Sequence, residues 1–339
     1  MVHFKLVIVL MLLFSSCSKK EAFEYSSVNF ELVKLSEGVY GCIHKFGGKA
    51  ICNAGIIDNG NETLIFDSFL TPSVARELID VVEELGLSPI KYVVNSHSHN
   101  DHIRGNQVFS PDIKIISTHR TAELIKEWEP INIKDEKEYA PQRFAYYDSL
   151  YYAYKGDTTA RAYLQILMWR PYYESLAESH KVVKTRLPVI FVDDQQYFNG
   201  PKRKVQIISK GQGHTESDLI LYLPDDQIVF TGDLVFNECH PYIPHGSIPD
   251  WKDWLGFINS LNIDIVVPGH GKIGTKDIVT TMRSYIISIE DLATEMHSQG
   301  LSAEDVDKIE IPLQYKDWWF DQFFLSNLKF AFSKIEEKQ

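Results

Sequence analysis

Residues 97–102 read His97-Ser98-His99-Asn100-Asp101-His102, and this stretch decides how the rest of the chain is interpreted. It follows directly on residues 91–95, an apolar run typical of a buried strand. Imidazole and carboxylate groups are good ligands for zinc and similar divalent metals. Because a strand that runs into a loop can hold such side chains on one side of a sheet, the stretch predicts a metal site at a strand end.

Three later segments repeat this layout of apolar run, tight turn and metal-binding side chain. Residues 205–209 lead to His214, residues 227–231 lead to Asp233, and residues 264–268 lead to His270, each through at least one glycine. One such histidine is usually an ordinary loop residue. Four strand ends that all carry histidine or aspartate favour a shared metal site over an accident of composition.

The residues at these strand ends resemble the signature of the metallo-β-lactamase superfamily. The matching motifs are His97-x-His99-x-Asp101-His102, Gly213-His214-Thr215, Thr231-Gly232-Asp233 and Pro268-Gly269-His270-Gly271. The remaining motif, an aspartate that closes an early strand, would be Asp67. The resemblance covers about residues 31–300 apart from a helical insertion. It implies an α/β fold, an αββα sandwich of two mixed sheets faced by helices, with a dinuclear metal site at one edge.

The resemblance also assigns the ligands. It implies that one metal is held by His97, His99 and His214 and the other by Asp101, His102 and His270, with Asp233 as the bridge. Zinc is the expected metal, and iron or manganese would also accept histidine and aspartate ligands without cysteine. Asp101 is the candidate catalytic residue, because it could also orient the nucleophile.

Two divalent metals predict hydrolysis. A metal-bound water loses its proton near neutral pH and becomes hydroxide. Two cations, the two carboxylates and one hydroxide leave the site with a charge of roughly +1. Such a site attracts a carbonyl oxygen and stabilises the charge that develops on it. We therefore expect a metal-dependent hydrolase that attacks the carbonyl of an ester, lactone, thioester or amide.

Three other functions stay open. A zinc β-lactamase would hydrolyse β-lactam antibiotics, but the lactamases with similar strands carry cysteine at the position of Asp233 and lysine at that of Phe236. An iron-dependent redox enzyme, similar to the persulfide dioxygenases, is the second alternative. The third is a lipoprotein that only binds a ligand, although such proteins usually lose metal ligands.

The composition restricts the partners. The 339 residues are 44% hydrophobic and 24% charged, which is typical of a globular protein. The formal net charge of −12 argues against a nucleic-acid enzyme, since phosphate binding needs basic surface. The expected partner is therefore a small-molecule substrate.

The N-terminus predicts export. Lys5 precedes a short apolar run at residues 6–14, and Cys17 follows two serines, which resembles a bacterial lipoprotein processing site. We expect residues 1–16 to be a signal peptide, residues 17–30 a tether, and the lipid on Cys17 to hold the protein at the membrane of the bacterial cell envelope. The alternative is a plain signal peptide with an unrelated cysteine.

The domain organisation follows from the pattern of strands and helices. Strands are expected at residues 39–43, 50–57 and 62–67, and a helix from an N-cap at Thr71 to Gly86. The expected domain spans residues 31–300. Residues 301–339 would form a helical extension that ends in a helix at 318–335, which could cover the sheet or form a dimer surface.

An insertion at about residues 119–190 interrupts the motifs. Separate helices are expected there at 121–128, 140–154 and 159–180. Together with the loop at 237–249, the insertion is expected to shape the substrate pocket, because loops on a rigid scaffold often do so.

The remaining cysteines and histidines are less informative. Cys42 and Cys52 flank a hairpin-like turn and could form a disulfide or stay unpaired, and Cys239 is expected to be a buried, inert thiol. Asn237, His240 and His245 follow Asp233, so one of them could contact substrate; otherwise they are ordinary loop residues. No role is predicted for the other histidines, which are His44, His119, His180 and His297.

Overall fold

The computed structural model describes residues 25–337, whose strands form a seven-stranded and a five-stranded sheet. The first sheet has the order β1 (Phe30–Ser36), β2 (Val39–His44), β3 (Ala54–Asp58), β4 (Thr63–Phe66), β5 (Ile90–Val94), β6 (Lys114–Ser117) and β7 (Ile190–Phe191). The second has the order β12 (Ile265–Val267), β11 (Ile228–Phe230), β10 (Asp218–Leu223), β9 (Lys204–Gly211) and β8 (Gln195–Asn199). Both sheets are mixed, because β4 to β7 and the β11–β12 pair run parallel while their other neighbours pair antiparallel.

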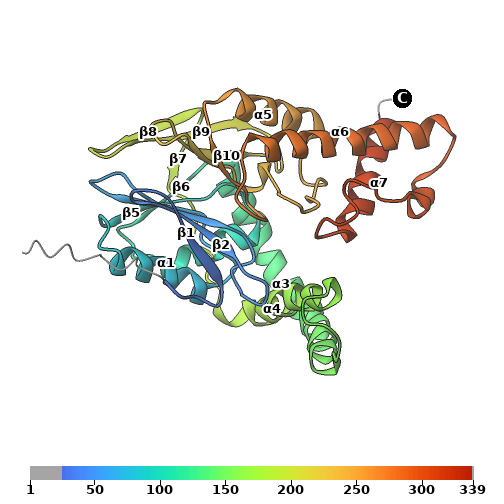
Figure 1. Cartoon of the computed structure of the whole chain (residues 1–339), viewed down its shortest axis with the longest axis horizontal. Helices are drawn as coiled ribbons and strands as arrows, with labels where there is room; N and C mark the ends of the chain where they lie inside the picture. Colours follow the sequence, from blue (N-terminus) through green and yellow to red (C-terminus); the bar gives the residue numbers. More distant parts are fainter. Residues whose placement is uncertain (1–24, 338–339) are drawn as a thin grey trace, which may run out of the picture.

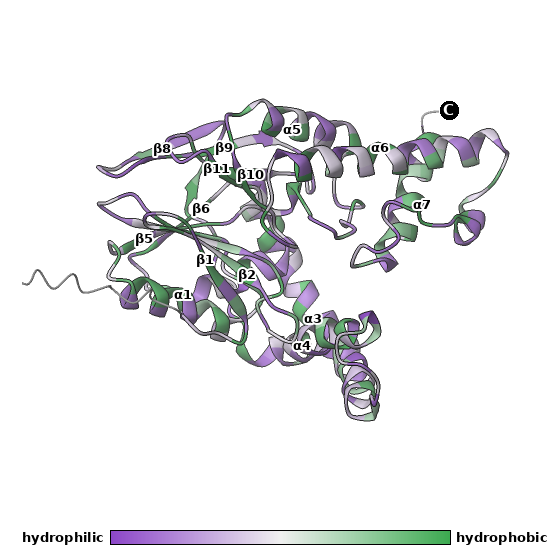
Figure 2. Cartoon of the chain, in the orientation of Figure 1, coloured by the Kyte–Doolittle hydropathy of each residue, from purple (hydrophilic) through white to green (hydrophobic). Residues whose placement is uncertain are grey.

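Apolar side chains hold the sheets and helices together in layers (Figure 1). One buried cluster joins the facing sides of the two sheets, with Leu64 and Phe66 from the first and Ile207 and Leu221 from the second. A second cluster lies between the first sheet and α1 (Pro72–Glu84), and a third between the second sheet and α5 (Ile248–Ser260) and α6 (Lys276–Ser298). Figure 2 shows the matching alternation of hydrophobic and hydrophilic colour along α1. The predicted αββα sandwich is confirmed.

The first helix begins where the sequence predicts. Thr71 is the N-cap of α1, its side chain accepts a hydrogen bond from the backbone N–H of Val74, and Pro72 occupies the first turn. The strand expected at residues 50–57 is wrong at its start, because Ile51 has a φ of 73° and β3 begins only at Ala54. This break in the strand places residues 50–53 against the site described below.

The insertion is a helical hairpin of α3 (His119–Ala153) and α4 (Arg161–Val182) that projects from the sandwich (Figure 1). The two helices expected at 121–128 and 140–154 are instead one helix, which runs through Pro130 and Pro141. A proline inside a helix removes one backbone hydrogen bond and usually favours a break. Tertiary contacts override that preference here, since α3 packs along α4 and buries Glu129 and Glu136 against the sandwich.

The C-terminal part packs on the second sheet's helices. After the short helices α2 (Asn100–Ile103), η1 (Arg104–Val108), η2 (Gly232–Leu234) and η3 (Ala303–Lys308), the chain ends in α7 (Gln322–Glu336). Phe324, Leu328 and Phe332 of α7 are buried in the same cluster as Ile289 of α6. Residues 318–321, expected as the start of this helix, lie outside it.

Between residues 25 and 337 no helix has both the length and the apolar character needed to cross a membrane. The predicted signal peptide, Cys17 and most of the predicted tether lie outside the described residues. Of the two alternatives for Cys42 and Cys52, the structure has two free, buried thiols, and Cys239 is a free, buried thiol as expected.

Candidate metal centre

The predicted ligands meet at one edge of the sandwich, where strands of both sheets end. β5 leads into residues 97–102, and α2 begins at Asn100 within that stretch. From the second sheet, β9 leads to His214, β11 to Asp233 and β12 to His270. The structure therefore brings together side chains that are separated by more than a hundred residues in the sequence.

The first group consists of His97, His99, His214 and Asp233, whose ligand atoms all lie within 4.8 Å of one another. Oδ2 of Asp233 lies 3.4 Å from Nε2 of His214 and 3.7 Å from Nε2 of His97. Nδ1 of His99 lies 3.0 Å from Nε2 of His214. These are the four residues predicted to surround the first metal.

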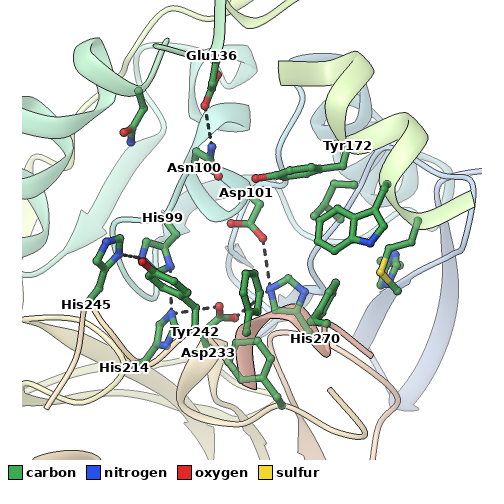
Figure 3. A pocket seen from close by; sticks show the side chains of 18 of the residues that line it. His99, Asn100, Asp101, Glu136, Tyr172, His214, Asp233, Tyr242, His245 and His270 are labelled. Atoms are coloured by element: carbon green, nitrogen blue, oxygen red, sulfur yellow. Dashed lines mark hydrogen bonds and ion pairs between the residues drawn. The ribbon is translucent and has the colours of Figure 1, made fainter. Parts of the chain in front are cut away.

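The second group shares Asp233 with the first. Its other oxygen, Oδ1, lies 3.2 Å from Nε2 of His102 and 3.5 Å from Nε2 of His270. Oδ2 of Asp101 lies 3.3 Å from Nε2 of His270 and 3.6 Å from Nε2 of His102. The two oxygens of Asp233 thus face two separate groups of imidazoles, and Figure 3 shows Asp233 between His214 and His270.

The buried polar atoms of both groups fit divalent cations. Nε2 of His97, Nε2 of His102 and Oδ1 of Asp233 are buried without a hydrogen-bond partner. Buried polar groups are rarely left unpaired, and one cation in each group would satisfy these three atoms. Burial also lowers the pKa of His97 and His214 well below the ordinary value and that of His99 to about 4. These imidazoles are therefore neutral, which is the form that binds metal.

Asp67, the aspartate that the resemblance placed at the end of an early strand, orients two of the imidazoles. It lies just after β4 with a φ of 59°, and its carboxylate accepts hydrogen bonds from the backbone N–H and the hydroxyl of Ser96. Its Oδ2 is 2.8 Å from Nδ1 of His102, and the Ser96 hydroxyl is 2.9 Å from Nδ1 of His97. Both imidazoles are thereby held with Nε2 directed at the site.

Two further residues support the ligands, and neither of these supporting roles was predicted from the sequence. Nδ1 of His245 lies 2.8 Å from Nε2 of His99, so this loop histidine holds a predicted ligand. Asn53 ties the first sheet to the His270 loop, because its side chain donates to the backbone oxygens of Pro268 and Gly271. His240 does not reach the site; it is buried and hydrogen-bonded to Tyr285.

Two glycines are required by the geometry. Gly232, next to Asp233, has a φ of 53°, a left-handed conformation that glycine adopts without strain. Glycine is required at position 269 for a different reason, because a Cβ atom there would lie 1.9 Å from Oδ1 of Asp233. The close approach of this backbone to Asp233 therefore excludes any side chain.

Comparison with known proteins decides the family. Residues 47–270 match the family model of the metallo-beta-lactamase superfamily. The chain belongs to this superfamily. It is 24% identical over 241 residues to the metallo-beta-lactamase type 2 of Bacillus cereus, an alignment that covers 69% of this chain and 73% of that protein. It is also 19% identical over 332 residues to the alkyl/aryl-sulfatase BDS1 of Saccharomyces cerevisiae, and there it covers 91% of this chain but only 48% of the yeast protein.

Solved structures of the superfamily have the same fold. The structure of TMB-1 superposes with a TM-score of 0.53 at 16% identity, over 77% of this chain and 98% of that one. A double mutant of the sec-alkyl sulfatase PisA1 superposes with a TM-score of 0.63 at 16% identity, over 90% of this chain and 50% of that one. The chain spans about half the length of the sulfatases it matches. With its His and Asp cluster, this superfamily member is a metallo-hydrolase.

A cavity of about 480 Å³ opens onto the candidate metal centre. As expected, the insertion and the loop after Asp233 contribute to its walls, with Trp169 and Tyr172 from α4 and Tyr242 and His245 from the loop. Phe320 and Phe323 of the C-terminal part also line it, although this part was expected to cover the sheet or form a dimer surface. His44, for which no role was predicted, lines it as well.

A third candidate ligand group contains a cysteine, for which no ligand role was predicted. Cys52, Asp101 and His102 have ligand atoms within 4.8 Å of one another. The Cys52 thiol donates a hydrogen bond to the backbone oxygen of Asp101 at 2.9 Å, and burial raises its pKa to about 12. In this protonated state it supports the ligand loop through a hydrogen bond.

Proposed function

We propose that the chain hydrolyses an ester, lactone, thioester or amide of a small molecule at a pair of divalent cations, with zinc as the expected metal. The arrangement of Asp233 carries this proposal, because its two oxygens face the two groups of imidazoles separately. His97, His99 and His214 would hold one cation, and Asp101, His102 and His270 the other. When bound, such a pair polarises the substrate's oxygen and lowers the pKa of water toward neutrality.

The protein's own residues supply the rest of the chemistry. Burial opposes the ionisation of Asp101, but His102 and His270 hold its pKa down to about 2, so it is a carboxylate at neutral pH. Asp101 lines the cavity and can accept a hydrogen bond from the attacking water, which orients that water.

β-Lactam hydrolysis is the less supported alternative. A β-lactam carries a carboxylate, yet among the cavity-lining residues of the described chain none is lysine or arginine. The position at which similar lactamases carry lysine is Phe236, whose ring stacks on His270 at 5.1 Å and 13°. Turnover of nitrocefin that chelation abolishes would favour the lactamase.

Sulfate-ester hydrolysis is a second candidate function. The alignment with the yeast sulfatase covers 91% of the chain and the superposition on PisA1 covers 90%. An alignment that covers nine-tenths of the chain must include much of the helical insertion and of the C-terminal part. The alignment with the Bacillus lactamase covers only 69% of the chain. Since both segments line the cavity, sulfate esters belong in the substrate panel.

Metal analysis of the purified chain, followed by activity assays, tests these proposals. We expect two zinc ions per chain and metal-dependent turnover of at least one carbonyl or sulfate ester. Asp233→Asn should lose metal and activity, while Asp226→Asn, a remote carboxylate paired with Arg203, should keep both. Bound iron without hydrolysis of any substrate would instead support the redox alternative.

We also propose that the chain is exported and lipid-anchored through Cys17. Residues 1–17 of the sequence support this, by the pattern described above. Labelling with radioactive palmitate in a bacterial host tests it. Label on the wild-type chain that disappears in Cys17→Ser is the expected result, and an unlabelled chain would contradict the proposal.

A further inference from the structure

Aromatic rings from three separate segments form a continuous wall around the cavity. Trp169 of α4 contacts Phe320 with ring centroids 5.7 Å apart, and Phe320 contacts Phe323 at 5.9 Å. Phe323 then contacts Tyr242 at 5.4 Å, and Tyr242 contacts His245 at 4.9 Å. We call Trp169, Phe320, Phe323 and Tyr242 the aromatic collar. All four line the cavity.

The collar reaches the candidate metal centre itself. The ring of Phe320 meets the imidazole of His270 edge-on, at 5.7 Å and 88°. At the other end of the collar, His245 is hydrogen-bonded to His99. Figure 3 shows Tyr242 and His245 on one side of the ligands and Tyr172 on the other. A group attached to the scissile bond would therefore contact the collar as soon as the bond itself reached the centre.

Phe320 is held in place by its neighbours on both sides. It has a φ of 62°, which is unfavourable for a phenylalanine and persists only where the surroundings enforce it. The backbone N–H of Trp319 donates to the oxygen of Glu238 at 2.8 Å, and that of His240 to the oxygen of Trp319 at 2.7 Å. Arg161 of α4 lies over the Trp319 ring at 4.4 Å. Strained backbone of this kind is concentrated at functional sites.

The charges in the cavity wall disfavour the binding of an anionic group beside the aromatic collar. No lysine or arginine of the described chain lines the cavity. Its two carboxylates beyond the metal ligands are Asp135, which is exposed, and Glu136, which is buried and accepts hydrogen bonds from Arg104 and Asn100. Beside the collar the described residues thus offer apolar surface and negative charge, with no lysine or arginine to pair with a carboxylate there.

We propose that the aromatic collar is a binding subsite for an uncharged apolar group, alkyl or aryl, attached to the scissile bond of the substrate. This proposal deepens the proposed function and rests on it for the reaction, but the binding of an apolar group can be measured without turnover. The cavity volume of about 480 Å³ lies within the range of small-molecule sites.

Binding of N-phenyl-1-naphthylamine, an uncharged fluorescent aryl probe, tests the subsite alone. We expect saturable binding to the zinc-loaded chain, weakened at least tenfold in Trp169→Ala and in Phe320→Ala. Tyr152→Ala is the matched control, because Tyr152 is exposed at the far end of the insertion. Absence of saturable binding to the wild type, or binding to both collar variants with the wild-type affinity, would overturn the proposal. Circular dichroism of each variant checks that it is folded.

A pair of esters tests the preference for an uncharged group. The p-nitrophenyl ester of hexanoic acid and the p-nitrophenyl monoester of adipic acid have acyl chains of the same length, and only the second ends in a carboxylate. We expect kcat/KM to be at least tenfold higher for the hexanoate, and to rise roughly fourfold per methylene from acetate to hexanoate. Equal or better turnover of the adipate would contradict the subsite. Probe binding without hydrolysis of any ester would contradict the proposed function and leave the subsite standing.

Discussion

Oδ2 of Asp67 lies 2.8 Å from Nδ1 of His102, so a carboxylate that is not among the predicted ligands fixes the orientation of one of them. The same carboxylate holds Ser96, whose hydroxyl contacts His97. A carboxylate can accept all of these hydrogen bonds, whereas an amide must present donors at one end. The Asp67 carboxylate therefore supports one imidazole from each of the two ligand groups.

Asp67→Asn should weaken metal binding by about 10- to 100-fold, because partners of metal-bound histidines have effects of this size. Competition with a fluorescent chelator measures the affinity. Asp226→Asn removes a partly buried carboxylate that is remote from the site, and it should leave the affinity unchanged. An Asp67→Asn chain with wild-type affinity would show that His102 and His97 keep their orientation without this carboxylate.

Gly269→Ala should displace Asp233, because the new methyl group would lie 1.9 Å from its Oδ1. We expect the variant to bind fewer than two metal ions per chain and to lose most of its activity. Gly256→Ala is the matched control, since a Cβ at that helical glycine meets nothing within 4 Å. Mass spectrometry of the folded variants measures the number of metal ions bound per chain. Two ions bound to Gly269→Ala would contradict the prediction.

The sequence was sufficient for the core of the site because each predicted ligand lies directly after an apolar strand and a tight turn. Where a strand ends, the position of the next few side chains is nearly determined, so His97, His214, Asp233 and His270 could be expected at one edge of the sandwich. The N-cap at Thr71 was predictable for the same reason, since capping depends on a few neighbouring residues.

Contacts between distant segments could not be predicted in this way. The hydrogen bond between His99 and His245 joins residues 146 positions apart, and nothing local in the loop distinguishes His245 from His240. The position of Phe320 depends on how the C-terminal part docks on α4 through Arg161. The continuous helix α3 was not predicted either. The two prolines that disfavour it can be read from the local sequence, whereas its packing along α4, which offsets their cost, depends on distant residues.

Removal of metal should destabilise the protein. A ligand present at about a thousand times its Kd stabilises the folded state by about 4 kcal/mol. For a chain of this length we therefore expect EDTA to lower Tm by at least about 5 °C. In Asp233→Asn, which lacks the bridging carboxylate, EDTA should change Tm by less than half as much. Equal Tm values of the wild type with and without EDTA would mean that the folded chain binds no metal.

Arg104 joins the insertion to the sandwich through a buried ion-pair network. Its guanidinium donates to Glu129 at 2.6 Å and to Glu136 at 2.8 Å, and all three side chains are buried. Arg104→Met would leave two buried carboxylates without their cation and should cost about 3–5 kcal/mol of unfolding free energy. Arg120→Met, which removes exposed ion pairs with Glu123 and Glu216, should cost less than about 1 kcal/mol. Chemical denaturation measures both, and equal losses would contradict the assigned burial.

His240 should make stability depend on pH, because burial lowers its pKa to about 4 in the folded chain. When the chain unfolds, this pKa returns to about 6.5. Below pH 6.5 the unfolded chain therefore binds a proton that the folded chain does not, so the contribution of His240 is complete above pH 6.5 and is lost as the pH falls toward 4. Between pH 7.5 and 5.5 the loss should be about 1 kcal/mol.

His240→Gln removes the titration while its amide can still bond to Tyr285 and to the backbone oxygen of Tyr315. Denaturation of both chains in EDTA, where the metal makes no contribution, isolates this effect. The fall in unfolding free energy from pH 7.5 to 5.5 should be about 1 kcal/mol smaller in His240→Gln than in the wild type. An equal fall in both chains would mean that His240 is protonated as readily in the folded protein as in the unfolded one.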